Sequence, residues 1–293
     1  MKKTHNAPSV SKTRSLPRRH FLAIALIAGG LATASTAQAD LVFQMDFNDA
    51  SGSASLVDRG TTGEAGAFTT GGASYSTTVA PSNTGGFSGS FNGASGAADF
   101  GDISALDGLT TMTITAWIRP DGLNPGGPSG SGRIVHKRMN VDGFDLYYYD
   151  TAGELEFVGE GGGGVTNGGG SFAGQQWIWV AVTYDGTQAT NNVTFYTGDG
   201  TTLSAGSMTS LDKGALLANR TSLRIGNNRV GTRTYSGLID NVRIYNSVED
   251  AASLTSIMQF DDVGTTVDIP EPRTCALLAS LSGLVCVMMR RRR

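Results

Sequence analysis

Residues 237–246 read Gly-Leu-Ile-Asp-Asn-Val-Arg-Ile-Tyr-Asn, and this stretch decides the fold. Its two-residue alternation predicts a β-strand at 238–245. One expected face carries Leu238, Asp240, Val242 and Ile244, and the other carries Ile239, Asn241, Arg243 and Tyr245. An aspartate among core-facing aliphatic side chains is costly unless a cation or hydrogen-bond donors hold it. The stretch therefore predicts a buried strand with a polar site at Asp240.

The body of the chain has the same short, turn-bounded character. β-Branched or aromatic runs are separated by clusters of Gly, Asn, Asp and Ser. Besides 238–245, we expect strands at 41–47, 89–91, 97–103, 111–119, 133–138, 144–149, 154–158, 177–184, 192–197, 202–207 and 222–225, and one helix at 249–258. So many short strands do not fit one open sheet, so we expect an all-β sandwich of two packed sheets.

The composition of the 293 residues supports this class. Glycine accounts for 41 residues and only 16% are charged, which excludes a coiled coil. Six of the 22 Lys and Arg residues lie in 1–39 and five in 270–293, leaving 11 against 24 acids in an acidic body. Because basic charge clusters only at the two ends, we expect no nucleic-acid partner. Both cysteines lie within 270–293, so the body has no disulfide.

Several blocks occur in the order seen in laminin G-like domains of the concanavalin A-like jelly-roll type. They are TITAWIRP at 113–120, IVHK at 134–137, GFDL at 143–146, WIWVAVTYD at 177–185, LRIGN at 223–227 and the stretch at 237–246. The chain resembles that family over about residues 41–258. The resemblance implies a domain at 40–260 with two antiparallel sheets of six or seven strands. It also implies binding of carbohydrate or protein and often one calcium ion.

The resemblance implies a calcium site around Asp240. In relatives the corresponding aspartate commonly helps to bind Ca²⁺ with groups from the first strand and the turn after it. Carried over here, the ligands are Asp46, Asn48, Asp58 and Asp240, which all offer the hard oxygen donors that calcium prefers. The alternative is that Asp240 accepts hydrogen bonds from loop N–H groups without a metal.

Outward-facing aromatic side chains are the candidate sugar contacts. If the even-numbered residues of 144–148 face the core, Tyr147 and Tyr149 point outward. The same alternation over 177–184 turns Trp179 away from the core. We expect Trp179, Tyr147 and Tyr149 to contact carbohydrate, because an exposed tryptophan is unusual. The alternative is that loops cover these rings.

Glu154, Glu156 and Glu160 raise the question of catalysis. Laminarinase-type glycoside hydrolases share the jelly roll and carry Glu-x-Asp-x-Glu on a concave strand. Here the Asp is missing and the third acid lies beyond Gly159, so Glu154 and Glu156 are expected on the solvent face of a hairpin. His136 is the only histidine after residue 39 and has no evident catalytic partner. We expect no enzyme activity.

The first 39 residues have the features of a secretory signal peptide. A basic region precedes an apolar run at 21–28, and Ala-Gln-Ala ending at Ala39 forms a small-x-small cleavage site. Arg18 and Arg19 resemble a twin-arginine signal, so export of a folded domain and export of an unfolded chain both remain open.

The last residues resemble a PEP-CTERM sorting signal at 270–293, after an acidic linker at 261–269. Pro270, Glu271 and Pro272 precede an apolar segment at 274–289 and a cluster of arginines that begins at Arg290. The apolar segment predicts a single transmembrane helix, and the arginines keep the C-terminus in the cytoplasm. The resemblance implies a Gram-negative cell in which an exosortase cuts the chain after transient anchoring in the inner membrane. The alternative is a permanent tail anchor.

These features predict a secreted, non-catalytic module. The inner-membrane-anchored precursor would face the periplasm, and the protein would then reach the cell surface or extracellular matrix. Its expected partner is extracellular polysaccharide or matrix. The alternatives are an adhesion or structural module with a protein partner and, less favoured by the residues, a divergent glycoside hydrolase.

Overall fold

A computed structural model describes residues 41–49, 55–83, 86–121, 131–149, 153–159, 163–167, 174–211 and 214–260. The chain divides into two compact units, Met1–Ala37 and Gln38–Arg293, and every described residue belongs to the second. The expected signal and sorting residues, Ala39, Pro270, Glu271, Pro272 and Arg290, lie outside the described ranges. In those ranges no helix is both long enough and apolar enough to cross a membrane.

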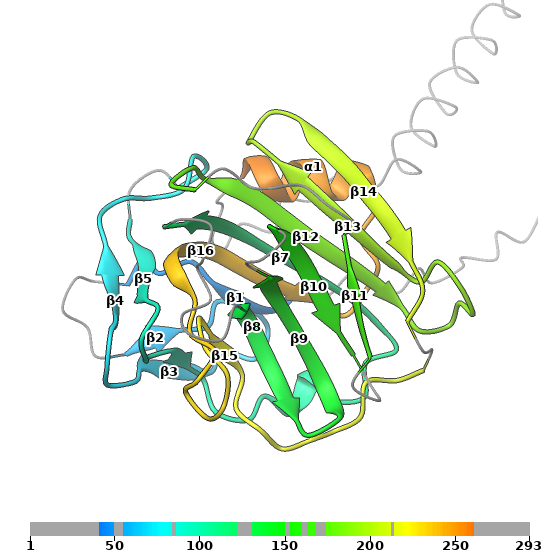
Figure 1. Ribbon diagram of the computed structural model, residues 1–293, viewed down its shortest axis with the longest axis horizontal. Coiled ribbons are helices and arrows are strands. Elements are labelled where there is room, and N and C mark those ends of the chain that lie inside the picture. Colours follow the sequence, from blue (N-terminus) through cyan, green and yellow to red (C-terminus); the bar gives the residue numbers. More distant parts are fainter. Residues whose placement is uncertain are drawn as a thin grey trace, which may run out of the picture. The chain divides into compact units, whose positions relative to one another are not determined.

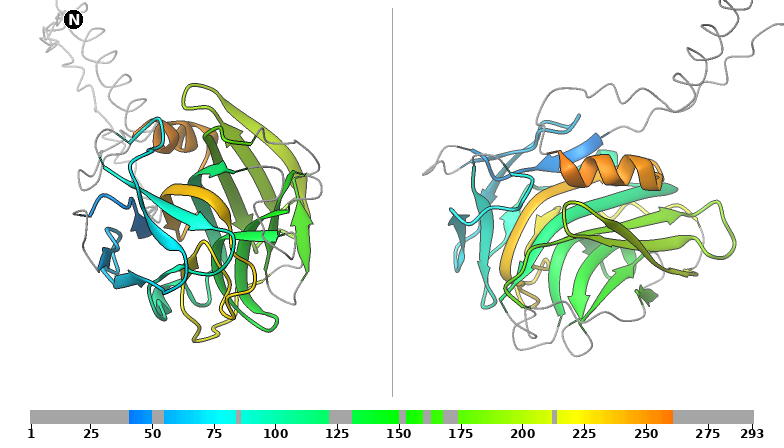
Figure 2. Two further views of the ribbon diagram at one scale, coloured as in Figure 1. Left: turned by 60° about the vertical axis from the view of Figure 1, so that its left-hand side comes forward. Right: turned by 90° about the horizontal axis from the view of Figure 1, so that it is seen from above.

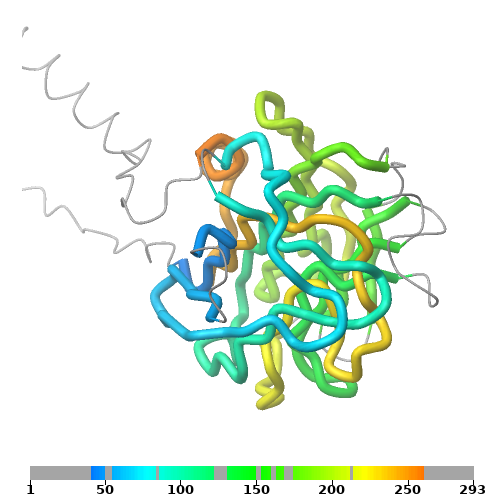
Figure 3. Tube along the Cα trace, turned by 90° about the vertical axis from the view of Figure 1, so that its left-hand side faces the viewer, coloured from blue at the N-terminus to red at the C-terminus, as the bar shows by residue number. Residues whose placement is uncertain are grey.

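The first sheet is antiparallel and includes the strand that contains Asp240. Its order is β14 (Leu203–Thr209), β13 (Val193–Gly198), β12 (Ile178–Asp185), β7 (Thr111–Pro120), β16 (Ser236–Tyr245), β5 (Ser88–Asn92) and β4 (Ala73–Ser76). The eighth strand, β1 (Leu41–Met45), pairs with β16 as well. Residues 236–239 of β16 pair with β5 and residues 242–245 pair with β1, so β16 changes neighbours at Asp240 and Asn241. Figure 3 shows the blue segment that contains β1 next to the orange segment that contains the end of β16, with which it pairs.

The second sheet is antiparallel and packs face to face on the first (Figure 1). Its order is β11 (Gly164–Thr166), β10 (Glu154–Val158), β9 (Asp142–Tyr149), β8 (Ser131–Met139), β15 (Arg224–Ile225), β6 (Ala98–Asp99), β3 (Ala65–Phe68) and β2 (Leu56–Val57). A short 3-10 helix, η1 (Ser104–Leu106), follows β6. The all-β sandwich of two antiparallel sheets is therefore confirmed.

The core lies between the sheets and follows the predicted alternation in most strands. Val180 and Val182 of β12 and Phe195 of β13 meet Leu146 of β9 and Phe157 of β10, and each is no more than 1% exposed. At roughly 25 cal/mol per Å² of buried apolar surface, such side chains contribute most of the stability of a sandwich without disulfides. Because side chains alternate along a strand, the residues next to these core residues point to the outer faces of the sheets, where a binding site can form.

The outer face of the first sheet carries the C-terminal helix, α1 (Ala251–Gln259) (Figure 2). Asp250 caps its first turn, because its carboxylate accepts a 2.8 Å hydrogen bond from the Ser253 N–H. Leu254 and Met258, one turn apart, are fully buried against the sheet in a second apolar cluster. At the other end, the guanidinium of Arg243 donates to the carbonyls of Ile257 and Phe260 at 2.9 and 3.0 Å, which fastens the helix to β16.

All twelve expected strands and the expected helix are present, and four short strands were not expected. These are β2, β3, β4 and β11, of two to four residues each, which are too short to show an alternating pattern. Each forms by pairing with a neighbouring strand, as β4 does with β5 and β11 does with β10. They raise both sheets to eight strands, above the six or seven that the resemblance implied.

Candidate functional site

A β-bulge places Asp240 differently from the sequence prediction. The register of β16 against β7 shifts between Asp240 and Arg243, and Asn241 has a left-handed backbone with a φ of 47°. Ile239, Val242 and Ile244 therefore face the core, whereas Asp240 lies opposite Trp117 on the outer face. The expected grouping of Asp240 with Val242 and Ile244 is wrong, because the bulge breaks the two-residue alternation.

Asp240 is nonetheless fully buried, because the segment before β5 covers it. Its carboxylate accepts hydrogen bonds from the Ala80 N–H at 3.1 Å, the Asn83 amide at 3.0 Å and the Asn241 N–H at 2.9 Å. Buried carboxylates need such donors. Two backbone N–H groups and one side-chain amide therefore surround the Asp240 carboxylate.

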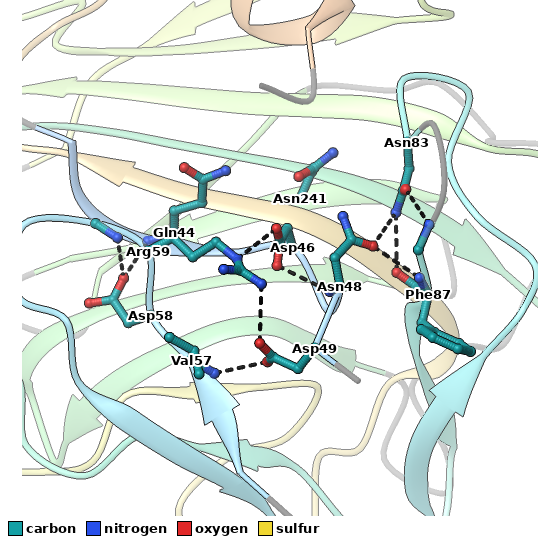
Figure 4. A network of polar contacts seen from close by, with 12 residues as sticks. Gln44, Asp46, Asn48, Asp49, Val57, Asp58, Arg59, Asn83, Phe87 and Asn241 are labelled. Carbon is teal, nitrogen blue, oxygen red and sulfur yellow. Dashed lines mark hydrogen bonds and ion pairs between the residues drawn. The ribbon is translucent and has the colours of Figure 1, made fainter. Parts of the chain in front are cut away.

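The amide nitrogen of Asn83 joins Asp240 to the end of β1. Besides Asp240, it donates to Asn48 Oδ1 and to the Phe87 carbonyl, each at 3.2 Å (Figure 4). Asn48 Oδ1 also accepts the Phe87 N–H at 3.0 Å. A Cβ on Gly86 would lie 1.2 Å from Asn48 Oδ1, so only glycine allows this approach. Three oxygens thus converge on one amide nitrogen.

Asp46 is buried beside this network and pairs with Arg59. Arg59 Nε lies 2.8 Å from Asp46 Oδ2, and its Nη2 lies 3.1 Å from Asp49 Oδ1 (Figure 4). Burial alone would lower the pKa of Arg59, but the hydrogen bond and charge of Asp46 and the charge of Asp49 outweigh it and raise that pKa. Arg59 therefore keeps its positive charge against Asp46. Phe47, the next residue, has a φ of 55°, which is rare for an aromatic residue.

Asp58 accepts hydrogen bonds from a different set of groups. Its carboxylate accepts the N–H groups of Gln44 and Gly60 at 2.8 and 2.7 Å, the Glu64 N–H at 3.4 Å and the Thr62 hydroxyl. Four donors from β1 and the 58–64 loop use both oxygens. Of the four predicted ligands, the structure brings Asp46, Asn48 and Asp240 into one region and leaves Asp58 out.

The oxygen atoms in this region are of the kind that calcium prefers as ligands. Two carboxylates, one amide oxygen and one carbonyl are hard oxygen ligands. The side chain of Asn241 is 3% exposed, and its amide oxygen and nitrogen make no hydrogen bond within the described ranges. In those same ranges no three His, Cys, Asp or Glu side chains gather as a metal site, so amide and carbonyl oxygens would have to complete the set.

Sequence reasoning missed Arg59, Asn83 and Asn241 in this region. The Asp-Asn pair at 240–241 was a usable signal, because asparagine tolerates the left-handed backbone of a bulge. Nothing local marks Asn83, which lies 157 residues before Asp240.

The outer face of the second sheet carries the predicted tyrosines. Tyr147 and Tyr149 point outward as expected, and Tyr149 is 40% exposed at the end of β9. Tyr147 is 8% exposed because the Arg133 guanidinium lies 4.0 Å above its ring. Burial and a hydrogen bond to Glu156 raise the pKa of Tyr147 well above its usual value, so this phenol stays neutral.

Asp145, on the same face, is 1% exposed and is surrounded by basic groups. His136 Nδ1 contacts Asp145 Oδ1, while Arg133 Nε and Arg138 Nη1 lie 3.5 and 3.8 Å from Asp145 Oδ2. His136 therefore has a buried acidic partner that the sequence could not identify, because the pair forms across β8 and β9.

Glu154 and Glu156 lie on this face as well and are half-buried. Glu154 pairs across the strands with Tyr149, and Glu156 with Tyr147. The third acid of the hydrolase-like pattern, Glu160, lies outside the described residues.

Trp179 points away from the main core, as the alternation predicted, but it is only 1% exposed. It packs with Trp117 of β7 and with Leu254 and Met258 of α1. The expectation that Trp179 is available to sugar is therefore wrong, because the helix covers this part of the sheet.

Two antiparallel sheets packed face to face define an all-β protein of the jelly-roll sandwich type. The chain belongs to the Concanavalin A-like lectin/glucanases superfamily, whose laminin G-type family matches residues 91–254, more than half of the chain. No curated protein sequence matches the chain.

Solved structures share this fold at low sequence identity. Domain 4 of AbnA, a GH43 extracellular arabinanase from Geobacillus stearothermophilus in complex with arabinotriose, has a TM-score of 0.54 and 16% identity, covering 75% of this chain and 99% of that domain. The botulinum neurotoxin serotype G binding domain has a TM-score of 0.52 and 12% identity, covering 75% and 50%. Trypanosoma rangeli sialidase in complex with sialic acid has a TM-score of 0.51 and 19% identity, covering 77% and 34%. At these low identities, the TM-scores show a common fold alone.

Proposed function

We propose that this protein is a non-catalytic carbohydrate-binding module that binds extracellular polysaccharide. The observation that carries the proposal is a row of polar side chains on the outer face of β8, β9 and β10, which ends at the exposed ring of Tyr149. The row consists of Arg133, His136, Asp145, Tyr147, Glu154, Glu156 and Tyr149. The ring of Tyr149 can cover the apolar face of a sugar while the half-buried carboxylate of Glu154, its cross-strand neighbour, accepts hydrogen bonds from the sugar hydroxyls. Domain 4 of AbnA, which shares this fold and is in complex with arabinotriose, supports the choice of ligand class.

The side chains of this row are already held in place by one another. Arg133 lies over Tyr147, Tyr147 bonds to Glu156, and His136 contacts Asp145. A ligand that binds here loses less free energy to the ordering of side chains than it would on a mobile surface. The arrangement therefore favours recognition of a flat, polar ligand.

The same contacts argue against hydrolysis. A retaining glycosidase needs two available carboxyl groups about 5 to 5.5 Å apart, one of which attacks the sugar. Asp145 is buried among His136, Arg133 and Arg138, and Glu156 is bonded to Tyr147. We therefore propose binding without turnover.

Calcium is part of the proposal. Asp46, Asn48 and Asp240, with the Phe87 carbonyl, are the groups that would hold it, and Arg59 and Asn83 now donate to these oxygens. A bound Ca²⁺ would balance the charge of Asp240 and would replace the ion pair between Asp46 and Arg59.

Export is the third part and rests on the sequence of the two ends. The signal at 1–39 and the Pro-Glu-Pro segment at 270–272 suit a protein displayed outside a Gram-negative cell after cleavage by an exosortase. Mass spectrometry of the secreted protein tests this, because cleavage near Glu271 removes the apolar segment.

The binding test uses a panel of bacterial and algal polysaccharides, each in excess calcium and again in EDTA. We expect at least one to bind and Tyr149→Ala to weaken it at least tenfold, or about 1.4 kcal/mol. Phe260→Ala is the matched control, because Phe260 is 56% exposed at the end of α1. Loss of binding in EDTA supports the calcium site.

The other outcomes contradict the proposal. If no polysaccharide binds in either condition, the protein-partner alternative takes its place. If reducing ends are released and Glu154→Gln or Glu156→Gln stops the release, the protein is a hydrolase.

A further inference from the structure

The first sheet has a hollow of about 440 Å³ on the outer face of β12, β13 and β14, beyond the part that α1 covers. Its floor follows from alternation in β13. Val193 and Phe195 face the core, so Thr194 and Tyr196 point outward. Thr183 of β12 pairs with Thr194 and widens this hydroxyl-bearing floor. The volume lies within the roughly 300–1,000 Å³ typical of small-ligand sites.

The lining has the chemistry of an uncharged polyol site. The side chains of Gln188, Asn191 and Tyr196 line it and make no hydrogen bond to any other described residue. Met208 and Val248, which are 59% and 44% exposed, add apolar surface beside the Tyr196 ring. Amides and hydroxyls both donate and accept hydrogen bonds, as sugar hydroxyls do.

Fixed charge is nearly absent from this lining. No Lys, Arg or His is among the described residues that form it, and the one acid, Asp185, already accepts hydrogen bonds from the N–H and the hydroxyl of Thr187. Burial, with a smaller effect of the charge of Asp250, raises the pKa of Tyr196, so its phenol remains a neutral donor and acceptor. An anionic sugar would find no positive partner among the described residues that line the hollow.

The loop that borders the hollow is held rigidly. Asn192 clamps the backbone of Leu211, because its amide donates to the Leu211 carbonyl at 2.9 Å and its oxygen accepts the Leu211 N–H at 2.8 Å. The Asn191 N–H donates to the Ser210 hydroxyl at 2.9 Å, and Asn191 has a left-handed backbone with a φ of 53°. The loop that carries Gln188 and Asn191 is therefore ordered before any ligand arrives.

We propose that this hollow is a second saccharide site, selective for uncharged sugars, with Tyr196, Gln188 and Asn191 as its contacts. The inference rests on the proposed function, because it assumes that the protein binds carbohydrate at all. The row that ends at Tyr149 lies on the outer face of the other sheet, so the two sites face away from each other. One molecule then bridges two polysaccharide chains, and joining them raises the overall avidity.

The test follows the methyl group of Met208 by NMR in the full protein. The probes are uncharged glucan, mannan, galactan and arabinan oligosaccharides and, for comparison, an oligouronate. We expect at least one uncharged probe to shift the Met208 signal in the wild type and in Tyr149→Ala. Tyr196→Ala should weaken this binding at least tenfold, and Tyr196→Phe, which keeps the ring, should weaken it less. Ser204→Ala, an exposed position on β14, is the control that should behave as the wild type.

The outcomes separate the two proposals. If saccharides bind, but the NMR signal of Met208 does not shift and Tyr149→Ala removes all binding, the second site is refuted while the proposed function stands. If no saccharide binds the wild type, both fall. A shift of Met208 by the oligouronate as large as by uncharged sugars overturns the selectivity. Bridging predicts that the wild type precipitates a bound uncharged polysaccharide, whereas Tyr149→Ala and Tyr196→Ala each bind it without precipitation.

Discussion

Asp240→Ala removes the acceptor that holds the bulge of β16 to the segment before β5. Three donors lose their partner, namely the N–H groups of Ala80 and Asn241 and the side-chain amide of Asn83. Asn83 keeps its bonds to Asn48 and Phe87. Ala80 and Asn241 are 1% and 3% exposed, so water does not replace the lost acceptor.

Each buried donor left without an acceptor costs about 1–3 kcal/mol, so two such donors cost about 4 kcal/mol. In a domain of this size that corresponds to a fall in Tm of about 8–16 °C. Asp240→Asn preserves the shape and one oxygen but turns an NH₂ group toward one donor, so we expect a smaller loss of about 1–3 kcal/mol.

Urea unfolding followed by tryptophan fluorescence, with EDTA present throughout, measures these differences without a metal contribution. Asp121→Ala is the control, because Asp121 is an exposed residue, and we expect a change within about 0.5 kcal/mol. If Asp240→Ala unfolds within about 1 kcal/mol of the wild type, the reasoning that its three hydrogen bonds hold the bulge is refuted.

Three further predictions concern other parts of the fold. Trp179→Ala should lower the free energy of unfolding by about 3–5 kcal/mol, because it leaves a cavity between β12 and α1, and an unchanged urea midpoint would contradict this packing. Lys137 Nζ is buried between Asp102 and Asp107 at 2.8 and 3.0 Å, so Lys137→Met should destabilise the protein by about 3 kcal/mol, as measured by thermal unfolding. Hydrogen bonds from Thr202 and Thr201 lower the pKa of Asp199 to about 2, below its ordinary 3.8, so this turn is stabilised above about pH 4 and loses that stabilisation as the pH falls toward 2. An NMR titration of the Asp199 carboxyl that gives a midpoint near 4 would show that the turn does not hold the charge.

The class of fold and most of the strands could be predicted from the sequence. In β9 and β12 the two-residue alternation correctly separated core from outer residues, because successive side chains of a strand point to opposite faces. The stretch 237–246 lies within the residues that match the family, although the bulge at Asn241 interrupts its alternation.

Tertiary contacts determine which outward-pointing residues are exposed and which polar groups lie close together. Trp179 points outward yet is covered by α1, whereas Tyr149 remains open, and alternation does not distinguish the two. The bulge at Asn241 reverses the expected face of Asp240, because it forms where β16 changes partner from β5 to β1. Asn83 reaches Asp240 across 157 residues. Such burial and convergence arise from contacts between distant segments, which the short-range period of a strand does not contain.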